Sequence, residues 1–142
     1  MLIFQHRLEH DAGIPQWRLS LTAEERCRSR HRFDKEGVPP LFFQLPRGTV
    51  LNPGDYLQAR SGEILQILAA PEDLLHVSSD NPLDLLKAAY HLGNRHVSLE
   101  VSQHYLRLAP DPVLEALLAT LNVTVVTVTE PFFPEPGAFH RH

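Results

Sequence analysis

The chain has 142 residues, of which 43% are hydrophobic and 21% charged, with a formal net charge of −4 and a single cysteine, Cys27. This composition is ordinary for a globular protein, and no apolar run approaches the ~18 residues needed to span a bilayer. One cysteine excludes an intramolecular disulfide framework and any Cys-x-x-Cys centre, and the acidic excess, which belongs to the second half of the chain, disfavours nucleic-acid binding.

The first half of the chain alternates short β-rich stretches with turn residues. Its start, MLIFQHRLEH, lacks the basic segment and long apolar core of a secretory signal, so we expect a cytoplasmic protein. Period-2 patterning and Gly/Pro punctuation predict six strands in a small antiparallel sheet pair or barrel. The strands are expected at residues 1–8, 17–21, 26–33, 41–45, 55–60 and 63–70.

The third of these stretches, RCRSRHRF, has arginine at every second position, which on a strand gives one basic face. The arginines are Arg26, Arg28, Arg30 and Arg32. Such a face could contact RNA or an acidic partner, but flanking carboxylates and the lack of interleaved aromatic residues favour a solvated face or a protein contact. Cys27 and His31 would lie ~13 Å apart on this strand, too far for a thiolate pair. No hydrolase, phosphate-binding or zinc-protease motif is present, so we expect no enzymatic activity.

From about residue 73 the pattern changes to alternating strands and helices. Asn81-Pro82 and Asp111-Pro112 each supply an N-cap followed by proline at the first helical position. The first helix is expected to end at Gly93 in a left-handed conformation. Strands are expected at residues 74–79, 96–102, 104–108 and 123–129.

The resulting order, βαββαβ, is that of a ferredoxin-like split sheet. The fold class is therefore α+β. We expect an all-β domain at residues 1–72 and a ferredoxin-like domain at residues 73–142. Units of this size have small cores, so dimerisation would be a natural supplement.

Histidine must supply most ligands if this protein binds a transition metal. His91 and His96 flank a Leu-Gly-Asn-Arg turn and could form a metal pair, but His91 could equally finish a helix, and their spacing is not a known chelating geometry. His140 and His142 lie on a Pro/Gly-rich tail, where they could close over a metal held elsewhere or simply end the chain.

The stretch YHLGNRH resembles the signature of the UreE family of urease accessory proteins, which deliver nickel during urease maturation. The stretches LTAEERCRSRHRF, LPRGTVLNPGDYLQA and AAPEDLLHV are similar to that family's first domain, and PFFPEPGAFH is similar to the end of its second. The resemblance implies a β-rich partner-binding domain followed by a ferredoxin-like domain that binds metal and forms a homodimer.

In that family the histidine that ends the GNRH motif lies near the dimer axis, so that both copies bind one ion. Carried over, this residue is His96, joined by His140 or His142, with His91 at or near the site. The implied cargo is Ni²⁺, for which Zn²⁺ or Cu²⁺ can substitute in vitro, and binding should weaken towards pH ~6 because the imidazoles must be neutral. Some relatives carry further histidines where this chain has Pro110 and Pro112, so that auxiliary site is not expected.

The implied partners are urease accessory proteins, including the GTPase of the activation complex, and the urease apoprotein, with no nucleic acid and no membrane. The alternative is a protein-interaction module that uses the basic strand at residues 26–32, with metal binding incidental.

Overall fold

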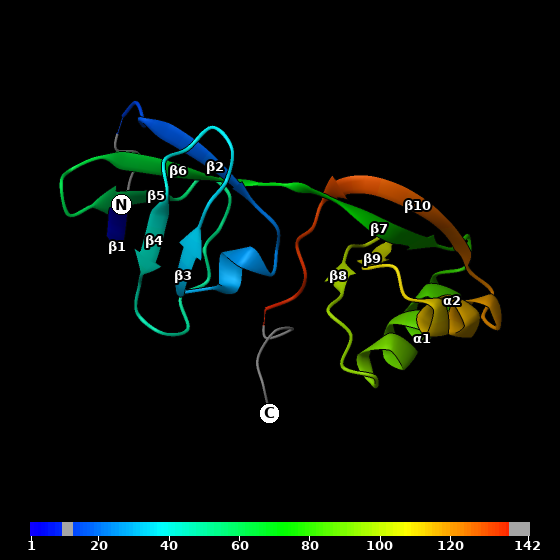
Figure 1. The fold of residues 1–142 in the computed structure, drawn as a ribbon. Helices are drawn as coiled ribbons and strands as arrows, with labels where there is room; N and C mark the ends of the chain where they lie inside the picture. Colours follow the sequence, from blue (N-terminus) through cyan, green and yellow to red (C-terminus); the bar gives the residue numbers. More distant parts are fainter. Residues whose placement is uncertain (10–12, 137–142) are drawn as a thin grey trace. The chain divides into compact units, whose positions relative to one another are not determined.

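A computed structural model describes residues 1–9 and 13–136 of the chain (Figure 1). The chain divides into two compact units, Met1–Ala70 and Pro71–His142. Within the described residues, no helix combines the length and the apolar character that crossing a membrane requires.

The first unit is a six-stranded sheet with the strand order β2-β6-β5-β1-β4-β3. Its strands are β1 (Leu2–Leu8), β2 (Trp17–Leu21), β3 (Arg30–Phe33), β4 (Leu41–Gln44), β5 (Tyr56–Ala59) and β6 (Ile64–Ala69). The expected antiparallel pairing was wrong for two pairs, because β1 runs parallel to β4 and β2 parallel to β6. Parallel partners are joined by long connections, so no local turn signal in the sequence reveals them.

Alternate residues of these strands fill one apolar core. On β6, Leu65 and Ile67 are fully buried while their neighbours are only partly so. Phe33 packs on Phe43 with 4.8 Å between ring centroids, and Phe4 meets Phe43 edge-on at 6.5 Å. Full burial of a leucine or phenylalanine side chain contributes about 1.5–3 kcal/mol, so the inward positions stabilise this sheet.

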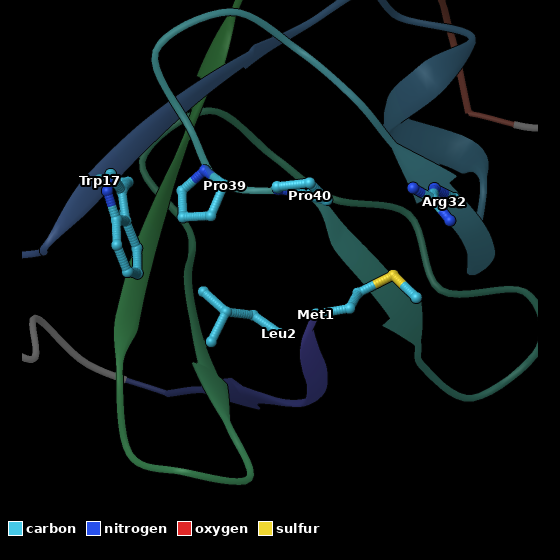
Figure 2. Close-up of a pocket in the computed structure, with 6 residues that line it drawn as sticks. All are labelled: Met1, Leu2, Trp17, Arg32, Pro39 and Pro40. Atoms are coloured by element: carbon cyan, nitrogen blue, oxygen red, sulfur yellow. The ribbon is translucent and has the colours of Figure 1, made fainter.

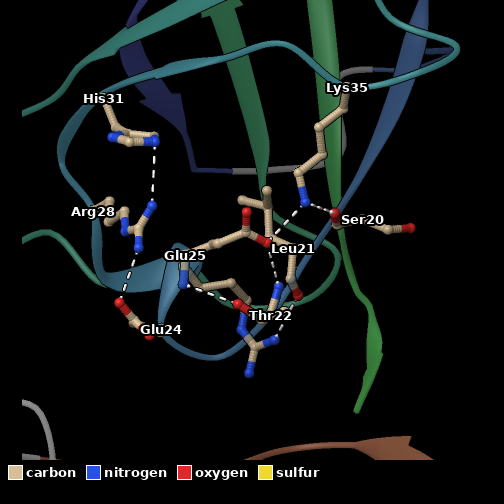
Figure 3. A network of polar contacts seen from close by, with 9 residues as sticks. Ser20, Leu21, Thr22, Glu24, Glu25, Arg28, His31 and Lys35 are labelled. Atoms are coloured by element: carbon tan, nitrogen blue, oxygen red, sulfur yellow. Dashed lines mark hydrogen bonds and ion pairs between the residues drawn. The ribbon is translucent and has the colours of Figure 1, made fainter.

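Residues 26–33 do not form one strand, which corrects the expectation from their alternating arginines. A short 3-10 helix, η1 (Glu25–Cys27), precedes β3. The Thr22 amide donates to Glu25 Oε1 at 3.0 Å and the Glu25 amide donates to Thr22 Oγ1 at 3.2 Å (Figure 3). This reciprocal pair is a capping box, and the Thr-x-x-Glu spacing that announces it is present in the sequence.

The basic stripe expected on this stretch is consequently interrupted, because only Arg30 and Arg32 of the four arginines lie on β3. Arg26 is only 4% exposed and donates to the Leu21 carbonyl at 3.0 Å. The two arginines that flank Arg30 are engaged by nearby carboxylates. Arg28 contacts Glu24 at 2.9 Å, and Arg32 contacts Asp34 at 2.8 Å.

The second unit is a four-stranded antiparallel sheet with the strand order β10-β7-β9-β8 and two helices. Its elements are β7 (Pro71–Ser78), α1 (Pro82–Gly93), β8 (Glu100–Val101), β9 (Leu106–Leu108), α2 (Pro112–Ala119) and β10 (Thr124–Pro131). The chain order βαββαβ with this strand order confirms the ferredoxin-like architecture. Strands β8 and β9 are shorter than expected.

Both helices begin where the capping residues predicted. The Asn81 side chain accepts a hydrogen bond from the Leu83 amide, and Asp111 accepts from the amides of Val113 and Leu114. The helices then pack on one face of the sheet through a shared apolar core. Its buried members are Leu75, Val77, Leu85, Ala88, Leu92, Leu99, Leu106, Leu108 and Leu118.

The cap of α2 gives a stability prediction. We expect Asp111→Ala to lower the free energy of unfolding by about 1 kcal/mol, because two helix amides lose their acceptor. Asp111→Asn keeps an oxygen acceptor and should stay within a few tenths of a kcal/mol of the wild type. Urea unfolding followed by circular dichroism measures both, and equal losses would contradict the capping role.

Candidate metal centre

The turn that carries His96 is held by the end of α1. The amides of residues 94–96 each donate to a carbonyl of the last helical turn, at 3.0 or 3.1 Å. The Arg95 guanidinium donates to the carbonyl of His91 at 3.0 Å. Because these bonds satisfy carbonyls that a helix end otherwise leaves unpaired, the helix fixes the position of the turn.

His96 itself has an unusual backbone. Its φ is 54°, and no other non-glycine residue in the described ranges has a positive φ. For an L-residue the left-handed conformation costs roughly 1–2 kcal/mol, and strain kept at an exposed position points to a function. Two expectations were wrong here. Gly93 ends the helix without a positive φ, and His96 lies in the turn, since β8 begins only at Glu100.

His91 occupies the last turn of α1, as its position in the sequence predicted. Its ring is half-buried and meets the Tyr90 ring edge-on, with 5.4 Å between centroids. A histidine there also suits the negative end of the helix dipole. The structural role proposed for His91 is therefore available whether or not it binds metal.

An exposed apolar face runs along α1. Leu83, Leu86 and Tyr90 are 54%, 67% and 65% exposed, and their spacing places them on one side of the helix. The core-facing side is formed by other residues, among them Leu85 and Leu92. This face, here called the α1 apolar face, lies on the same helix whose end holds His96.

The chain after β10 returns to the strand that follows His96. Phe132 is buried, the Phe133 amide donates to Glu100 Oε1 at 2.9 Å, and the Glu135 amide donates to the Leu99 carbonyl at 2.8 Å. We call residues 132–135 the C-terminal arm. The arm therefore brings the last described residues next to the segment that begins at His96.

Glu100, which receives the arm, is a buried carboxylate with several partners. It is 7% exposed, accepts from the Tyr105 hydroxyl at 3.1 Å and lies 4.0 Å from the Arg107 guanidinium. Arg107 also donates to His76 Nδ1 at 3.1 Å and stacks on the Tyr105 ring at 4.4 Å. Burial lowers the pKa of His76 and the Arg107 charge lowers it further, against the opposing effect of Glu100, so the ring stays a neutral acceptor.

Sequence reasoning gave no role to these four residues. The sequence marked this group only through Glu100, a carboxylate at a predicted strand position four residues after His96. The residues that contact Glu100 lie elsewhere in the chain. Cross-strand register supplies the link, because Glu100 pairs with Arg107 and His76 also pairs with Arg107.

The described residues do not form a complete metal site within one chain. Across residues 1–9 and 13–136, no three His, Cys, Asp or Glu side chains are grouped so that they could hold an ion. His91 lies in the last turn of α1 and His96 in the turn that follows the helix, while His140 and His142 lie outside the described residues. Cys27 is not in this unit, and burial raises the pKa of its thiol despite the neighbouring Arg26. At the end of α1, the described residues offer one exposed imidazole, that of His96.

Comparison with known proteins matches both units to one family. Residues 3–70 match the N-terminal domain and residues 72–142 the C-terminal domain of the UreE urease accessory protein. The chain is 48% identical to the urease accessory protein UreE of Microcystis aeruginosa, over 100% of this chain and 94% of the relative. It is 49% identical to the UreE of Nostoc sp., over 87% of this chain and 85% of the relative. It is 44% identical to the UreE of Nitrosococcus oceani, over 100% of this chain and 86% of the relative.

The backbone of His96 gives a prediction that is independent of metal. We expect the His96→Gly variant to be more stable than the His96→Ala variant, with a free energy of unfolding about 1 kcal/mol higher, because glycine adopts a positive φ without a Cβ clash. At His91, inside the helix, the order should reverse, with glycine about 0.5–1 kcal/mol worse than alanine. Urea unfolding of the four variants tests this, and an advantage for alanine at both positions would argue against strain at His96.

Proposed function

The chain belongs to the UreE family of urease accessory proteins, the non-enzymatic nickel chaperones of urease maturation, and we propose how it holds and transfers its cargo. One Ni²⁺ ion is bound between two copies of the chain by His96 of each copy. His140 or His142 completes the ligand set, and His91 is a further candidate. Transfer occurs by ligand exchange on docking to the urease activation complex in the cytoplasm.

The observation that carries this proposal is His96, whose side chain is exposed and whose backbone has a strained φ of 54°. A single ligand cannot hold an ion firmly, but a two-fold axis turns one histidine per chain into two facing ligands. Imidazole nitrogen suits Ni²⁺ as well as Zn²⁺ and Cu²⁺. A backbone fixed by the helix end gives both ligands a defined geometry before the ion arrives, which reduces the entropy lost on binding.

The α1 apolar face supports dimerisation through the second unit. Three large apolar side chains that are more than half exposed on one helix face are costly to leave in water. Each contributes favourably to the free energy of dimerisation once a second copy covers it. Because the face and the His96 turn belong to the same helix, a two-fold axis that passes near Tyr90, at the C-terminal end of the face, would bring the two turns close together.

The C-terminal arm supports a contribution from the tail histidines. His140 follows Glu135 by five residues, and His96 precedes Leu99 by three. An extended chain covers at most about 3.6 Å per residue, so the tail reaches about 18 Å from the arm while His96 lies within about 11 Å of Leu99 along the backbone. Since Glu135 is bonded to Leu99, the tail is long enough to reach the imidazole.

We assign partner binding to the N-terminal domain, residues 1–72, which contains the first unit, Met1–Ala70. An apolar hollow of about 480 Å³ on this unit is lined by Met1, Leu2, Trp17, Arg32, Pro39 and Pro40 (Figure 2). Hollows lined by aromatic and aliphatic side chains are where anchor residues of partner proteins bind. The partners are urease accessory proteins, including the GTPase of the activation complex, and the urease apoprotein.

The shared site predicts its own stoichiometry. Native mass spectrometry of the protein titrated with Ni²⁺ should show one tightly bound ion per two chains, and His96→Ala should lose that ion while remaining dimeric. His104→Ala removes an exposed imidazole of the same unit and should bind like the wild type. Unchanged nickel binding and unchanged urease activation by His96→Ala under limiting nickel would refute the proposal.

The proposed dimer contact through the α1 apolar face gives a second prediction. Leu86→Glu would place two carboxylates in the apolar contact between copies, so we expect it to shift the dimer to monomer at micromolar concentration and to weaken nickel binding with it. Val50→Glu makes the same change at an exposed apolar residue of the first unit and should leave the dimer intact. Analytical ultracentrifugation measures both, and a dimeric Leu86→Glu variant would place the interface elsewhere.

A further inference from the structure

The sheet of the first unit carries arginine on the face that is turned away from its core. Phe33, Leu41 and Phe43 are buried, so the residues that alternate with them on β3 and β4 point outwards. On β3 these residues are Arg30 and Arg32, and both are exposed. Two of the four arginines of the predicted basic stripe therefore remain on one face.

Cross-strand contacts extend this face over the neighbouring strands. Arg32 pairs with Phe42 and Arg30 pairs with Gln44, both on β4. Directly paired residues lie on the same face of a sheet. The guanidinium of Arg60, the residue after β5, donates to Gln44 Oε1 at 3.0 Å. A third exposed arginine, distant in the sequence, is thus brought to the same face.

We call this surface, which consists of Arg30, Arg32, Arg60 and the half-buried Phe42, the outer arginine face. Arg32 contacts Asp34 at 2.8 Å, but no carboxylate of the described residues forms an ion pair with Arg30 or Arg60. Charges on an edge strand such as β3 prevent pairing with other chains, but Arg60 follows β5, which lies inside the sheet. The excess of positive charge fits a surface of opposite charge.

The outer arginine face continues into the apolar hollow of the same unit. Arg32 stands at one end of the hollow and Trp17 at the other, with Pro39 and Pro40 between them (Figure 2). Tryptophan and arginine are enriched among the residues that contribute most to protein–protein binding. The unit therefore offers a continuous surface on which a partner finds both cationic groups and an apolar hollow.

We propose that the outer arginine face and the hollow together dock an acidic surface of a partner protein, which inserts one large apolar side chain into the hollow. Carboxylates of the partner pair with Arg30 and Arg60, and the apolar side chain packs on Trp17. This inference rests on the proposed assignment of partner binding to the N-terminal domain, and it names the chemistry of the partner's surface. Arginine suits this role because its planar guanidinium binds carboxylates with two parallel hydrogen bonds.

The test measures binding of the GTPase of the activation complex to the whole chain by biolayer interferometry, at low and at high ionic strength. We expect the Arg30→Ala/Arg60→Ala variant to bind about three- to twentyfold more weakly at low ionic strength, since two exposed ion pairs are lost. Its binding should also depend less on salt than that of the wild type. The Arg30→Lys/Arg60→Lys variant keeps both charges and should bind more tightly than the alanine variant.

The chain offers a matched control for these arginines. Arg18 is exposed on β2, the other edge strand of the sheet, and donates to Gln66 Oε1 at 3.1 Å, as Arg60 does to Gln44. Arg18→Ala removes the same charge and the same kind of hydrogen bond, and should bind the GTPase like the wild type. Circular dichroism establishes that each variant is folded.

A second pair of variants tests the hollow. Pro40→Glu places a carboxylate at an exposed position of the lining, where it repels an acidic partner and brings a charge next to the inserted apolar side chain. We expect binding of the GTPase to weaken by at least about tenfold. Pro53→Glu makes the same change at an exposed proline in the turn before β5 and should bind like the wild type.

The outcomes separate this inference from the proposed function. If the GTPase does not bind the wild-type chain, the proposed partner is wrong and the inference falls with it. If it binds, but the double-alanine or the Pro40→Glu variant binds equally tightly, only the inference is wrong. Loss of the dimer in these variants would show that the face pairs two copies instead. Binding of polyuridine RNA that the double-alanine variant loses would assign the arginines to nucleic acid, and either result would overturn the inference.

Discussion

The hydrogen bonds that tie residues 94–96 to the last turn of α1 hold His96 in a left-handed backbone conformation. The conformation is unfavourable for histidine by itself, so the helix must provide the compensating stability through Leu85, Ala88 and Leu92 in the core. The proposed metal ligand is therefore mounted on a rigid element whose inner face is packed and whose outer face is apolar. Rigid mounting matters for the proposed site, because each chain contributes one His96 and two copies must present theirs in register.

Helix α1 has one apolar face that packs on the sheet and another that is exposed, so the sequence pattern alone did not reveal which apolar residues form the core. Leu83, Leu86 and Tyr90 have helical spacing and mark the helix correctly, yet they are exposed and other leucines face the sheet. A helix with apolar residues on both sides is expected to be covered on both. One cover is the unit's own sheet, and in the proposed dimer the other is the second copy.

Local signals in the sequence located most elements but not their partners. Caps at Asn81 and Asp111 predicted both helix starts, and period-2 patterning predicted the strands of the first unit to within a few residues. Parallel pairing and the Glu100 cluster depend on which distant strands become neighbours, which no local pattern encodes. The alternating arginines misled because the Thr22–Glu25 capping box, a stronger local signal, turns the chain before a strand can start. For the proposed site, spacing within one chain gives His96 little weight, because its proposed ligand partners belong to another copy and to a segment 44 residues further along.

A chaperone must bind its ion firmly and still release it, and the proposed arrangement around His96 divides these requirements between different parts of the chain. Ligands on the helix ends give a fixed minimal set, whereas a ligand on a tether can be replaced by a donor of the acceptor protein without disturbing the dimer. Tethered binding depends on effective concentration, which falls as the free tether lengthens beyond the span it must cover.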